Sequence, residues 1–375
     1  FTAEGYRELR LQAGGMDALF KNGRLEIKLE RENSAFEKIA ELPTGIQPKS
    51  AHFSPGGERI FVPLLGQHGV DVFSAEPAGS APPRFERRLA VPGSRASGFV
   101  EAMIDGRRRE VWVSNMEENK VHIYDLDTLE YRGEAVTGGV MPKVIVQNGG
   151  GEITAVSNWL SKNISIFNTG TKERTAIIPV SGIPRGMAFS DDGSLLYVAI
   201  YDGPVIDVID MNTKKTAASY RFHEGTGAAR HIIYSGGKLY VSDMAQGSVC
   251  ILDAASGKLL KSRRVGPNIN TIVLTPDGKR IIASSRGRNN PEDYTRAGPE
   301  FGAVYVLSAD DLSVEEKIWG RNQPTGLAVS PGGTMLVFTD FLDANLEVYR
   351  MKNPGASSWV SSLDRKFIVL AWPIP

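Results

Sequence analysis

Short runs of apolar and alternating residues, separated by clusters of Gly, Pro, Asp and Asn, follow one another from residue 35 to residue 350. The clearest group lies in residues 181–222. Asp191-Asp192-Gly193 separates its first two apolar runs, and Asn212-Thr213 separates its last two. Runs of this length, bounded by turn residues, predict β-strands. The stretch therefore predicts one four-stranded antiparallel unit.

The opening of this unit recurs along the chain. Seven similar openings begin at Thr44, Pro92, Gly138, Ser181, Gly225, Gly266 and Gly320. They are spaced 41 to 54 residues apart, which is the period range of propeller blades. A four-stranded meander cannot bury both of its faces alone, so successive units must pack on one another. The sequence predicts an all-β fold, a seven-bladed β-propeller of four-stranded antiparallel blades around a central channel.

The two ends of the repeat region predict how the ring closes. The last repeat shows three clear strands, and the segment Phe36–Leu42 precedes the first opening. We expect this N-terminal segment to pair with the C-terminal blade as its fourth strand, which removes an open sheet edge. Two alternatives remain: segment 366–370 could take that edge or pair with 24–29, and an eight-bladed ring could use both termini. We expect one domain over residues 1–375, with an N-terminal extension (1–34), the blades (35–352) and a C-terminal tail (353–375).

Two segments resemble a known repeat. Residues 184–213 begin PRGMAFSDDGSLLYV and continue through VIDVIDMNT, and residues 324–338 read PTGLAVSPGGTMLVF. They resemble the YVTN-type repeat family of bacterial β-propellers, over about residues 35–350 of the chain. The resemblance implies the propeller fold. It does not choose an activity, because the family includes lactonase-like enzymes, surface proteins and binding proteins.

Composition narrows the classes of function. Lys plus Arg equals Asp plus Glu at 43 each, which argues against a nucleic-acid partner because such domains are basic. No apolar run approaches the length of a transmembrane segment. Cys250 is the only cysteine and lies in an apolar strand, which favours a small core residue over a reactive thiol. The start at Phe1, the cysteine count and the resemblance together favour an extracytoplasmic protein, periplasmic, secreted or on the cell surface, and we expect a monomer.

Motifs for sharper chemistry are not found. The sequence has no G-x-S-x-G, H-E-x-x-H, C-x-x-C-H or phosphate-loop motif. Its five histidines are scattered over different repeats, so we expect no metal site and no cofactor. The run Arg107-Arg108-Arg109 predicts a solvated turn, with a basic partner-binding patch as the alternative.

Two sets of loops should converge at one end of the channel, which we call the mouth. In an antiparallel blade the start of strand one and the end of strand two share an edge of the sheet. The opening positions carry the residues Lys49, Ser97, Lys143, Arg185, Arg230 (with His231), Asn270 and Thr325. Four of the seven are cationic in a chain of zero net charge. This enrichment predicts a site for a small polar or anionic ligand or a partner segment.

The positions after strand two pair a polar residue with an aromatic residue or methionine. The pairs are Asn115-Met116, Asn158-Trp159, Tyr201-Asp202, Asp243-Met244, Ser285-Arg286 and Asp340-Phe341. We expect them to join the ligand site, with the alternative that each polar residue only bonds its own turn. Glu101 would be an acidic channel residue facing the same side as Phe99, or else a turn residue. The predicted ligand-binding residues are Lys49, Lys143, Arg185, Arg230, His231, Asn115, Asn158, Trp159, Tyr201, Asp243, Arg286, Asp340 and Glu101.

The sixth repeat carries a long insertion over residues 284–302, between its second and third strands. Loops of this length are usually functional or disordered. We expect it to lie over the mouth, with Tyr294 or Phe301 above the channel and Arg286, Arg288 or Arg296 adding charge. A rim decoration is the alternative.

Three functions fit these features. The first is a non-catalytic binding propeller, the second a lactonase-like hydrolase in which Glu101 or Asp243 activates water, and the third a structural surface module.

Overall fold

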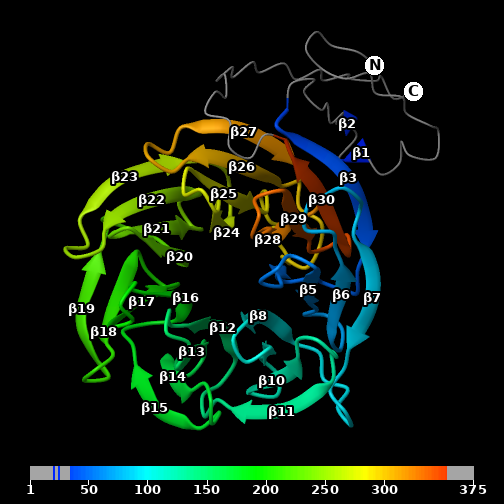
Figure 1. Ribbon diagram of the computed structural model, residues 1–375. Coiled ribbons are helices and arrows are strands. Elements are labelled where there is room, and N and C mark those ends of the chain that lie inside the picture. The colour runs from blue at the N-terminus through cyan, green and yellow to red at the C-terminus, as the bar shows by residue number, and fades with distance from the viewer. Residues whose placement is uncertain (1–19, 22–23, 26–33, 353–375) are drawn as a thin grey trace.

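The computed structural model describes residues 20–21, 24–25 and 34–352. Seven four-stranded antiparallel sheets form the blades of a β-propeller (Figure 1), which confirms the predicted fold class. A separate two-stranded sheet pairs β1 (Phe20–Lys21) with β2 (Arg24–Leu25). Within the described residues, no helix is long and apolar enough to cross a membrane. The predicted partner strands in 26–29 and 366–370 lie outside the described residues.

The first four blades follow the chain from the innermost to the outermost strand. Blade 1 contains β4 (His52–Phe53), β5 (Arg59–Pro63), β6 (Val70–Ser74) and β7 (Arg84–Leu89). Blade 2 contains β8 (Phe99–Asp105), β9 (Glu110–Asn115), β10 (Lys120–Asp125) and β11 (Tyr131–Val136). Blade 3 contains β12 (Pro142–Gln147), β13 (Ile153–Asn158), β14 (Asn163–Asn168) and β15 (Arg174–Pro179). Blade 4 contains β16 (Pro184–Phe189), β17 (Leu195–Ile200), β18 (Val205–Asp210) and β19 (Lys215–Arg221).

The last three blades complete the ring. Blade 5 contains β20 (Ala229–Ser235), β21 (Lys238–Asp243), β22 (Ser248–Asp253) and β23 (Leu259–Arg264). Blade 6 contains β24 (Ile269–Leu274), β25 (Arg280–Ser285), β26 (Ala303–Ser308) and β27 (Val314–Trp319). Blade 7 contains β28 (Pro324–Val329), β29 (Met335–Asp340), β30 (Asn345–Met351) and β3 (Phe36–Pro43).

The pairing of β3 with β30 joins the two ends of the repeat region. Leu42 lies opposite Leu346, and Phe36 lies opposite Met351. The N-terminal strand therefore supplies the fourth strand of the last blade, as the sequence pattern indicates, and β30 does not present an open edge.

The apolar cores lie between neighbouring blades. The second strands are buried on both faces, as in β9, whereas fourth strands such as β23 are largely exposed. One cluster joins Phe61 and Val72 of blade 1 to Phe99 and Val113 of blade 2. Each fully buried side chain of this kind contributes about 1.5–3 kcal/mol through removal from water. Each blade therefore depends on its neighbours for its core.

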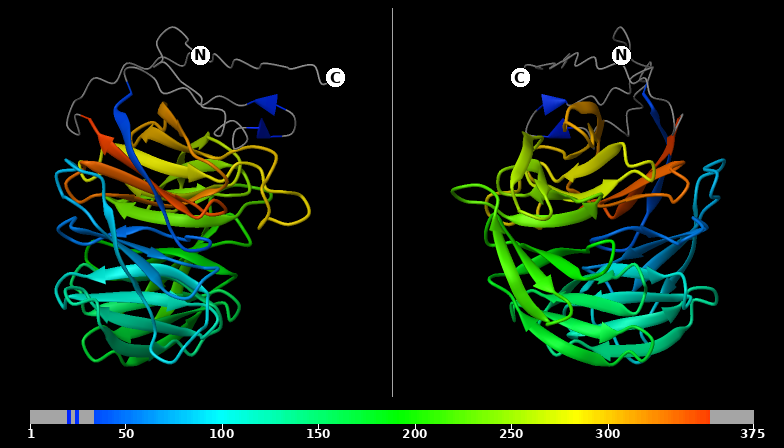
Figure 2. Two further views of the ribbon diagram at one scale, coloured as in Figure 1. Left: turned by 90° about the vertical axis from the view of Figure 1, so that its right-hand side faces the viewer. Right: turned by 60° about the vertical axis from the view of Figure 1, so that its left-hand side comes forward.

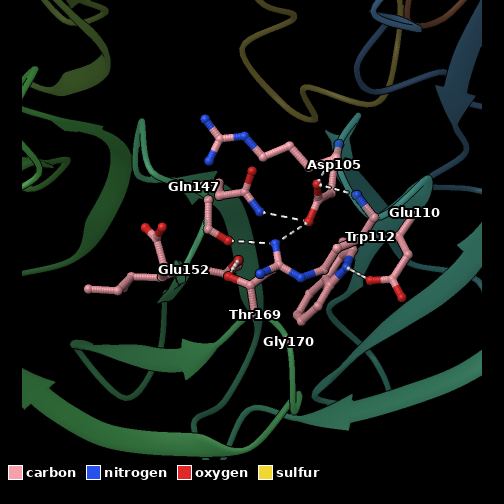
Figure 3. Close-up of polar contacts among 12 residues, drawn as sticks. Asp105, Glu110, Trp112, Gln147, Glu152, Thr169 and Gly170 are labelled. Carbon is pink, nitrogen blue, oxygen red and sulfur yellow. Dashed lines mark hydrogen bonds and ion pairs between the residues drawn. The ribbon is translucent and has the colours of Figure 1, made fainter.

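Polar contacts tie blades together at the end of the ring opposite the mouth, which we call the far face. Asp105, at the end of β8, accepts hydrogen bonds from the Arg108 guanidinium and from Gln147 Nε2 of blade 3, each at 3.0 Å. Figure 3 shows Gln147 pointing toward Asp105 and the Trp112 indole pointing toward Glu110. The turn with three arginines is therefore bonded into the junction of blades 2 and 3.

Candidate functional site

The first strand of each blade begins with one pair at the mouth and then shifts register. In blade 3, Pro142 pairs with Asn158, and the ladder resumes at Ile145 opposite Val156. The same shift occurs after Phe99, Pro184, Ala229, Ile269 and Pro324. Such bulges re-aim side chains at the rims of closed sheets.

The residue after each first pair defines the innermost position at the mouth. From blade 1 to blade 7 these residues are Lys49, Val100, Lys143, Arg185, Arg230, Asn270 and Thr325. The placement of Ser97 at this position was wrong. The opening loop of blade 2 covers residues 90–98 and is longer than that of blade 7, which covers 320–323, so Val100 occupies the position instead.

Hydroxyl groups hold these inner residues in place across the blade junctions. Ser157 Oγ accepts the backbone N–H of Val144 in its own blade and donates to the carbonyl of Arg185 in the next, both at 3.0 Å. We call the hydroxyls in this role bridging hydroxyls. They belong to Ser114, Ser157, Ser242, Ser284 and Thr339. Each accepts the backbone N–H that the bulge leaves unpaired, and each donates to a backbone carbonyl at the start of the next blade.

Five cations gather at the mouth, and we call them the cation cluster: Lys49, Lys143, Arg185, Arg230 and Arg286. The charges of the other four all act on Lys49. Arg185, Arg230 and Arg286 are only 5%, 6% and 5% exposed, whereas the two lysines are half-buried. Four members are the predicted opening residues, and Arg286 comes from the second set of loops. The structure thus brings together cations from five of the seven blades.

Burial and mutual repulsion disfavour the charged form of these groups. Burial, then repulsion from Arg185, lowers the pKa of Lys143 to about 7. Burial and Arg286 hold the pKa of Lys49 well below its usual value. Burial also lowers the pKa of Arg286 to about 10. A nearby negative charge would therefore stabilise the charged forms of these side chains.

The cation cluster has no acidic partner at ion-pair distance in the described part of the chain. Arg185 Nη1 and Arg286 Nη2 are buried and make no hydrogen bond there. Arg286 Nε donates to Thr325 Oγ1 at 3.1 Å, which orients its guanidinium. Buried polar groups are nearly always hydrogen-bonded, so these two nitrogens mark positions where an acceptor is missing.

Aromatic rings and a methionine support the cations. Lys49 Nζ lies 4.8 Å from the centre of the Phe341 ring, and Arg286 Cζ lies 5.0 Å from the same centre. Lys143 Nζ lies 5.8 Å from the Trp159 ring and contacts Met116 Sδ. Such cation–π contacts contribute about 0.5–2 kcal/mol each. They hold the cations without neutralising them.

Trp159 and Tyr201 also face one another across blades 3 and 4, with ring centres 4.7 Å apart. The Tyr201 hydroxyl contacts Met244 Sδ at 3.5 Å. The register places Ile200, not Tyr201, opposite Pro184, so Tyr201 corresponds to Met116 and Trp159 in the other blades. In the other five predicted pairs the second residue holds this position, whereas in blade 4 the first residue, Tyr201, holds it and Asp202 lies one position further along.

In these five pairs the first, polar residue bonds neighbouring loops and strands instead, as Ser285 does through its donation to the Pro267 carbonyl. Asn115 Oδ1 accepts the backbone N–H groups of Glu117 and Glu118 at 3.0 and 3.1 Å. Asp243 Oδ1 accepts the N–H groups of Ala228 and Gln246. The side chains of Asp340 and Asn158 are also bonded within the protein. Asp340 accepts the Arg321 N–H, and Asn158 Nδ2 donates to Asn163 and Ser165. For these four residues the alternative of a turn-bonding role fits the contacts better than ligand binding.

Glu101 is an acidic residue whose charge acts on Arg185 and Arg230. Although burial opposes it, a 2.8 Å hydrogen bond between Glu101 Oε1 and His52 Nε2 lowers the pKa of Glu101. Burial lowers the pKa of nearby His231 to about 4, so this imidazole is neutral. Phe99 packs in the apolar cluster between blades, while Glu101 borders the channel, so the expectation that they face the same side is not met.

A cavity of about 630 Å³ occupies the channel on the far side of the cation cluster. Glu101, His52 and His231 line part of its wall. Apolar side chains such as Val144, Met187 and Leu327 form much of its wall. The channel thus has a cationic end and a less polar end.

The insertion between β25 and β26 reaches the mouth, as predicted. Figure 2 shows this yellow-orange loop extending beyond the blades. The Tyr294 ring centre lies 6.0 Å from Arg286 Cζ, and Gln323 Nε2 donates to the Tyr294 carbonyl. Phe301 is buried. Of the three predicted arginines only Arg286 joins the cluster, because Arg288 pairs with Glu300 and Arg296 pairs with Glu292.

Sequence reasoning missed the bridging hydroxyls and the His52–Glu101 pair, whereas Phe341 was expected at the site as the neighbour of Asp340. The bridging hydroxyls had a signal, because a Ser or Thr precedes the last residue of strand two in five blades. The His52–Glu101 pair had none, since it joins residues 49 positions apart on two blades.

No family model matches the chain. Over 338 residues the chain is 35% identical to a protein named Antigen Lp49, from Leptospira interrogans serogroup Icterohaemorrhagiae serovar copenhageni (strain Fiocruz L1-130). The match covers 86% of this chain and 72% of that protein. Membership of the YVTN-type repeat family, which the sequence resembles, is therefore not confirmed.

Proposed function

The chain belongs to the same family as Antigen Lp49, and from that premise we propose that it is an exported binding propeller that holds an anionic group at the mouth of its channel. The ligand class is carboxylate or phosphate, either free or carried by a partner. The proposal concerns binding, with the blades serving as a rigid frame for the cation cluster.

The observation that carries the proposal is the pair of unused donors in the cluster. Arg185 Nη1 and Arg286 Nη2 are buried without an acceptor among the described residues. An unsatisfied buried donor costs about 1–3 kcal/mol, and more when it belongs to a charged group. An oxyanion between the arginines would remove this cost and reduce the repulsion within the cluster. Guanidinium groups suit both carboxylate and phosphate, because their planar donors match two oxygens at once.

An extracytoplasmic location is supported by two features. The relative is named an antigen, and the YVTN-type repeats that the chain resembles occur in surface proteins. Fractionation of the native host, followed by immunoblotting with an antibody to this chain, tests the location. Recovery of the protein with the cytoplasmic fraction would overturn it.

The binding test compares two double variants on the full chain. Thermal unfolding and calorimetry are run with acetate, succinate, citrate, phosphate and pyrophosphate, using the wild type and Arg185→Met/Arg230→Met. The matched control is Arg263→Met/Arg264→Met, which removes two arginines from the exposed strand β23. We expect at least one anion to raise the Tm of the wild type and the control by about 2 °C or more. The cluster variant should lose this shift.

Two results would overturn the proposal. One is that no anion shifts the wild type. The other is that the cluster variant responds as strongly as the control.

A second candidate function, hydrolysis of a lactone or ester, rests on the His52–Glu101 pair. Their 2.8 Å hydrogen bond at the cavity is the arrangement in which a carboxylate orients an imidazole. His52 would take a proton from water as the water adds to the carbonyl carbon. The C–O bond then breaks, and the imidazolium returns the proton to the leaving oxygen. Asp243 is a poor alternative base, because it is fully buried and bonded to His223 and two amides.

A panel of lactones and esters in a pH-stat assay tests this second function. Glu101→Gln should lower turnover at least about 100-fold. The matched control is His223→Asn, which removes another imidazole bonded to a carboxylate, away from the cavity. Turnover by the wild type that is unchanged in Glu101→Gln would exclude the pair, and no turnover on any substrate would exclude the activity.

A further inference from the structure

The exposed apolar side chains are unevenly distributed over the described part of the molecule. Eight large apolar residues are exposed: Ile46, Phe85, Val136, Val140, Leu160, Ile177, Leu260 and Tyr294. Four of them lie singly on the outermost strands, where scattered apolar residues are ordinary. The other four, Ile46, Val140, Leu160 and Tyr294, lie on the loops of the mouth. None of the eight lies on the far-face turns.

Each of the four mouth residues belongs to a blade that supplies a lysine or arginine to the cation cluster. Val140 and Leu160 flank blade 3, where Leu160 N–H donates to the Val140 carbonyl at 3.1 Å. Their neighbours Met141 and Trp159 are bonded in the same way, and Trp159 supports Lys143. Tyr294 contacts Arg286 in blade 6, and Ile46 precedes Lys49 in blade 1. Exposed apolar side chains therefore lie on the mouth loops of three blades that supply cations, and we call these four residues the apolar rim.

The rim and the centre differ in how far they are exposed. Leu160 is 58% exposed, whereas Arg185 is 5% exposed. An occupant that uses both features must therefore carry a negative group that reaches the buried arginines and an apolar part that contacts the exposed loops. A small free anion would use the centre and leave the rim exposed.

We propose that the mouth docks a segment of another protein that inserts one acidic side chain into the cation cluster and packs apolar side chains on Val140, Leu160 and Tyr294. The inference rests on the proposed function, because it assumes that the cluster holds an anion. The positive charge of the cluster favours an acidic residue in the partner segment, and the apolar rim favours apolar residues on either side of it. A membrane fits less well, because a planar lipid surface would meet the rim and leave its headgroups away from the recessed arginines.

The test selects peptides without assuming their sequence. A displayed library of random nonapeptides is panned on the full wild-type chain, and enriched peptides are then synthesised and measured by fluorescence anisotropy. We expect the enriched sequences to share an Asp or Glu with apolar residues within three positions. Enrichment of sequences that lack either feature, or no enrichment at all, would overturn the proposal.

Two variants separate this inference from the proposed function. Val140→Ser/Leu160→Ser should weaken the peptide at least fivefold and leave binding of the small anion unchanged. Arg185→Met/Arg230→Met should weaken both. The matched control is Val136→Ser/Leu260→Ser, which removes two exposed apolar side chains from the outermost strands. Circular dichroism and thermal unfolding confirm that each variant is folded.

The remaining outcomes are equally decisive. An unchanged peptide affinity in Val140→Ser/Leu160→Ser would overturn the docking surface without contradicting the anion site. Binding to phosphatidylglycerol vesicles that depends on the rim, without peptide binding, would replace the protein partner with a membrane. Failure of both peptide and small anion to bind would remove the proposed function as well.

Discussion

Arginines at the two ends of the propeller have opposite surroundings. On the far face, Arg108 donates to Asp105 and to the carbonyl of Gly151, while Arg107 donates to the carbonyl of Gly149. At the mouth, Arg185 and Arg286 keep buried nitrogens without any acceptor in the described chain. The far-face residues stand three in a row in the sequence, and those of the mouth are scattered over several repeats.

The number of hydrogen-bond partners, more than the clustering of charge in the sequence, therefore distinguishes the far-face arginines from those of the mouth. A run of arginines in a turn can satisfy its donors locally, with carbonyls of the next blade. Arginines that converge on an axis from several blades repel one another and stay unsatisfied. The second arrangement lowers stability, because buried donors without an acceptor are unfavourable.

The largest expected effect comes from breaking the far-face network. Asp105 is fully buried and accepts four hydrogen bonds, from the N–H groups of Arg107 and Arg108, the Arg108 side chain and Gln147. Asp105→Ala should lower the free energy of unfolding by about 3 kcal/mol, because it leaves these donors unsatisfied. Urea unfolding measures the loss. By contrast, Arg185→Met should leave the ligand-free stability unchanged or raise it, and an equal loss in both variants would contradict the comparison.

The blades could be predicted from the sequence, because turn residues repeat at a fixed period. The position of the cations at the start of the first strands could be predicted too, because each turn fixes where the next strand begins. The hydrogen bonds and ion pairs of the individual side chains could not be predicted. Asn115 and Asp243 accept backbone N–H groups of the loops beside them, and these contacts depend on how each loop folds, which the sequence pattern does not show. Ser97 was misplaced because the length of an opening loop does not show where its strand begins. Ion pairing of Arg288 and Arg296 within the insertion depends on how that loop folds back on itself.

The second effect is the pH dependence of ligand-free stability. The pKa of Lys143 is about 7 in the folded chain and near 10.5 when unfolded. Between these values the unfolded chain binds more protons, so stability rises with pH. A rise of about 1–2 kcal/mol from pH 7 to pH 9 is expected, less than the full linkage value since the Lys143 residue is partly exposed to solvent. Urea unfolding at pH 7, 8 and 9 should show a flatter profile for Lys143→Met than for the exposed control Lys215→Met.

The third effect is proton uptake on anion binding, which follows from the same groups. A bound anion raises the pKa of Lys143 and Lys49 by opposing their repulsion, so protons bind with the ligand near pH 8. Calorimetry in two buffers of different ionisation enthalpy should show uptake of about half a proton or more, and affinity should fall about tenfold between pH 7 and pH 9. Lys143→Met should reduce both effects. Binding that releases protons would show that the lysines do not contact the anion.

A smaller loss is expected from removing one bridging hydroxyl. Ser157→Ala frees the Val144 N–H and the Arg185 carbonyl, which should lower the free energy of unfolding by about 1–2 kcal/mol. Because Arg185 is then less firmly held, anion affinity should also fall, by about threefold. Ser219→Ala is the matched control, since it removes a hydroxyl on the outermost strand of blade 4 that bonds Asp207 of its own blade and joins no opening strand. Equal anion affinity in both variants would show that the bridge serves stability alone.

The smallest effect restores a bridge where one is missing. In blade 4, Ala199 precedes the end of β17 at the position that Ser114, Ser157, Ser242 and Ser284 hold elsewhere. The backbones it would join are already close, because a Cβ added to Gly186 would lie 2.9 Å from the Arg230 carbonyl oxygen. By analogy with Ser157, a hydroxyl at this position would accept the Gly186 N–H and donate to that oxygen. Ala199→Ser should therefore raise the free energy of unfolding by about 0.5–1 kcal/mol.

The control for this change is Ala199→Cys, which adds a similar group with weaker hydrogen bonding. If space alone decided the outcome, both variants would lose stability, because Ala199 is fully buried in the core between blades 4 and 5. If the bridge forms, the serine variant should be the more stable of the two and should hold Arg230 more firmly. A serine variant no more stable than the cysteine variant would mean that blade 4 satisfies these backbone groups in another way, and that five bridges are enough to position the cations.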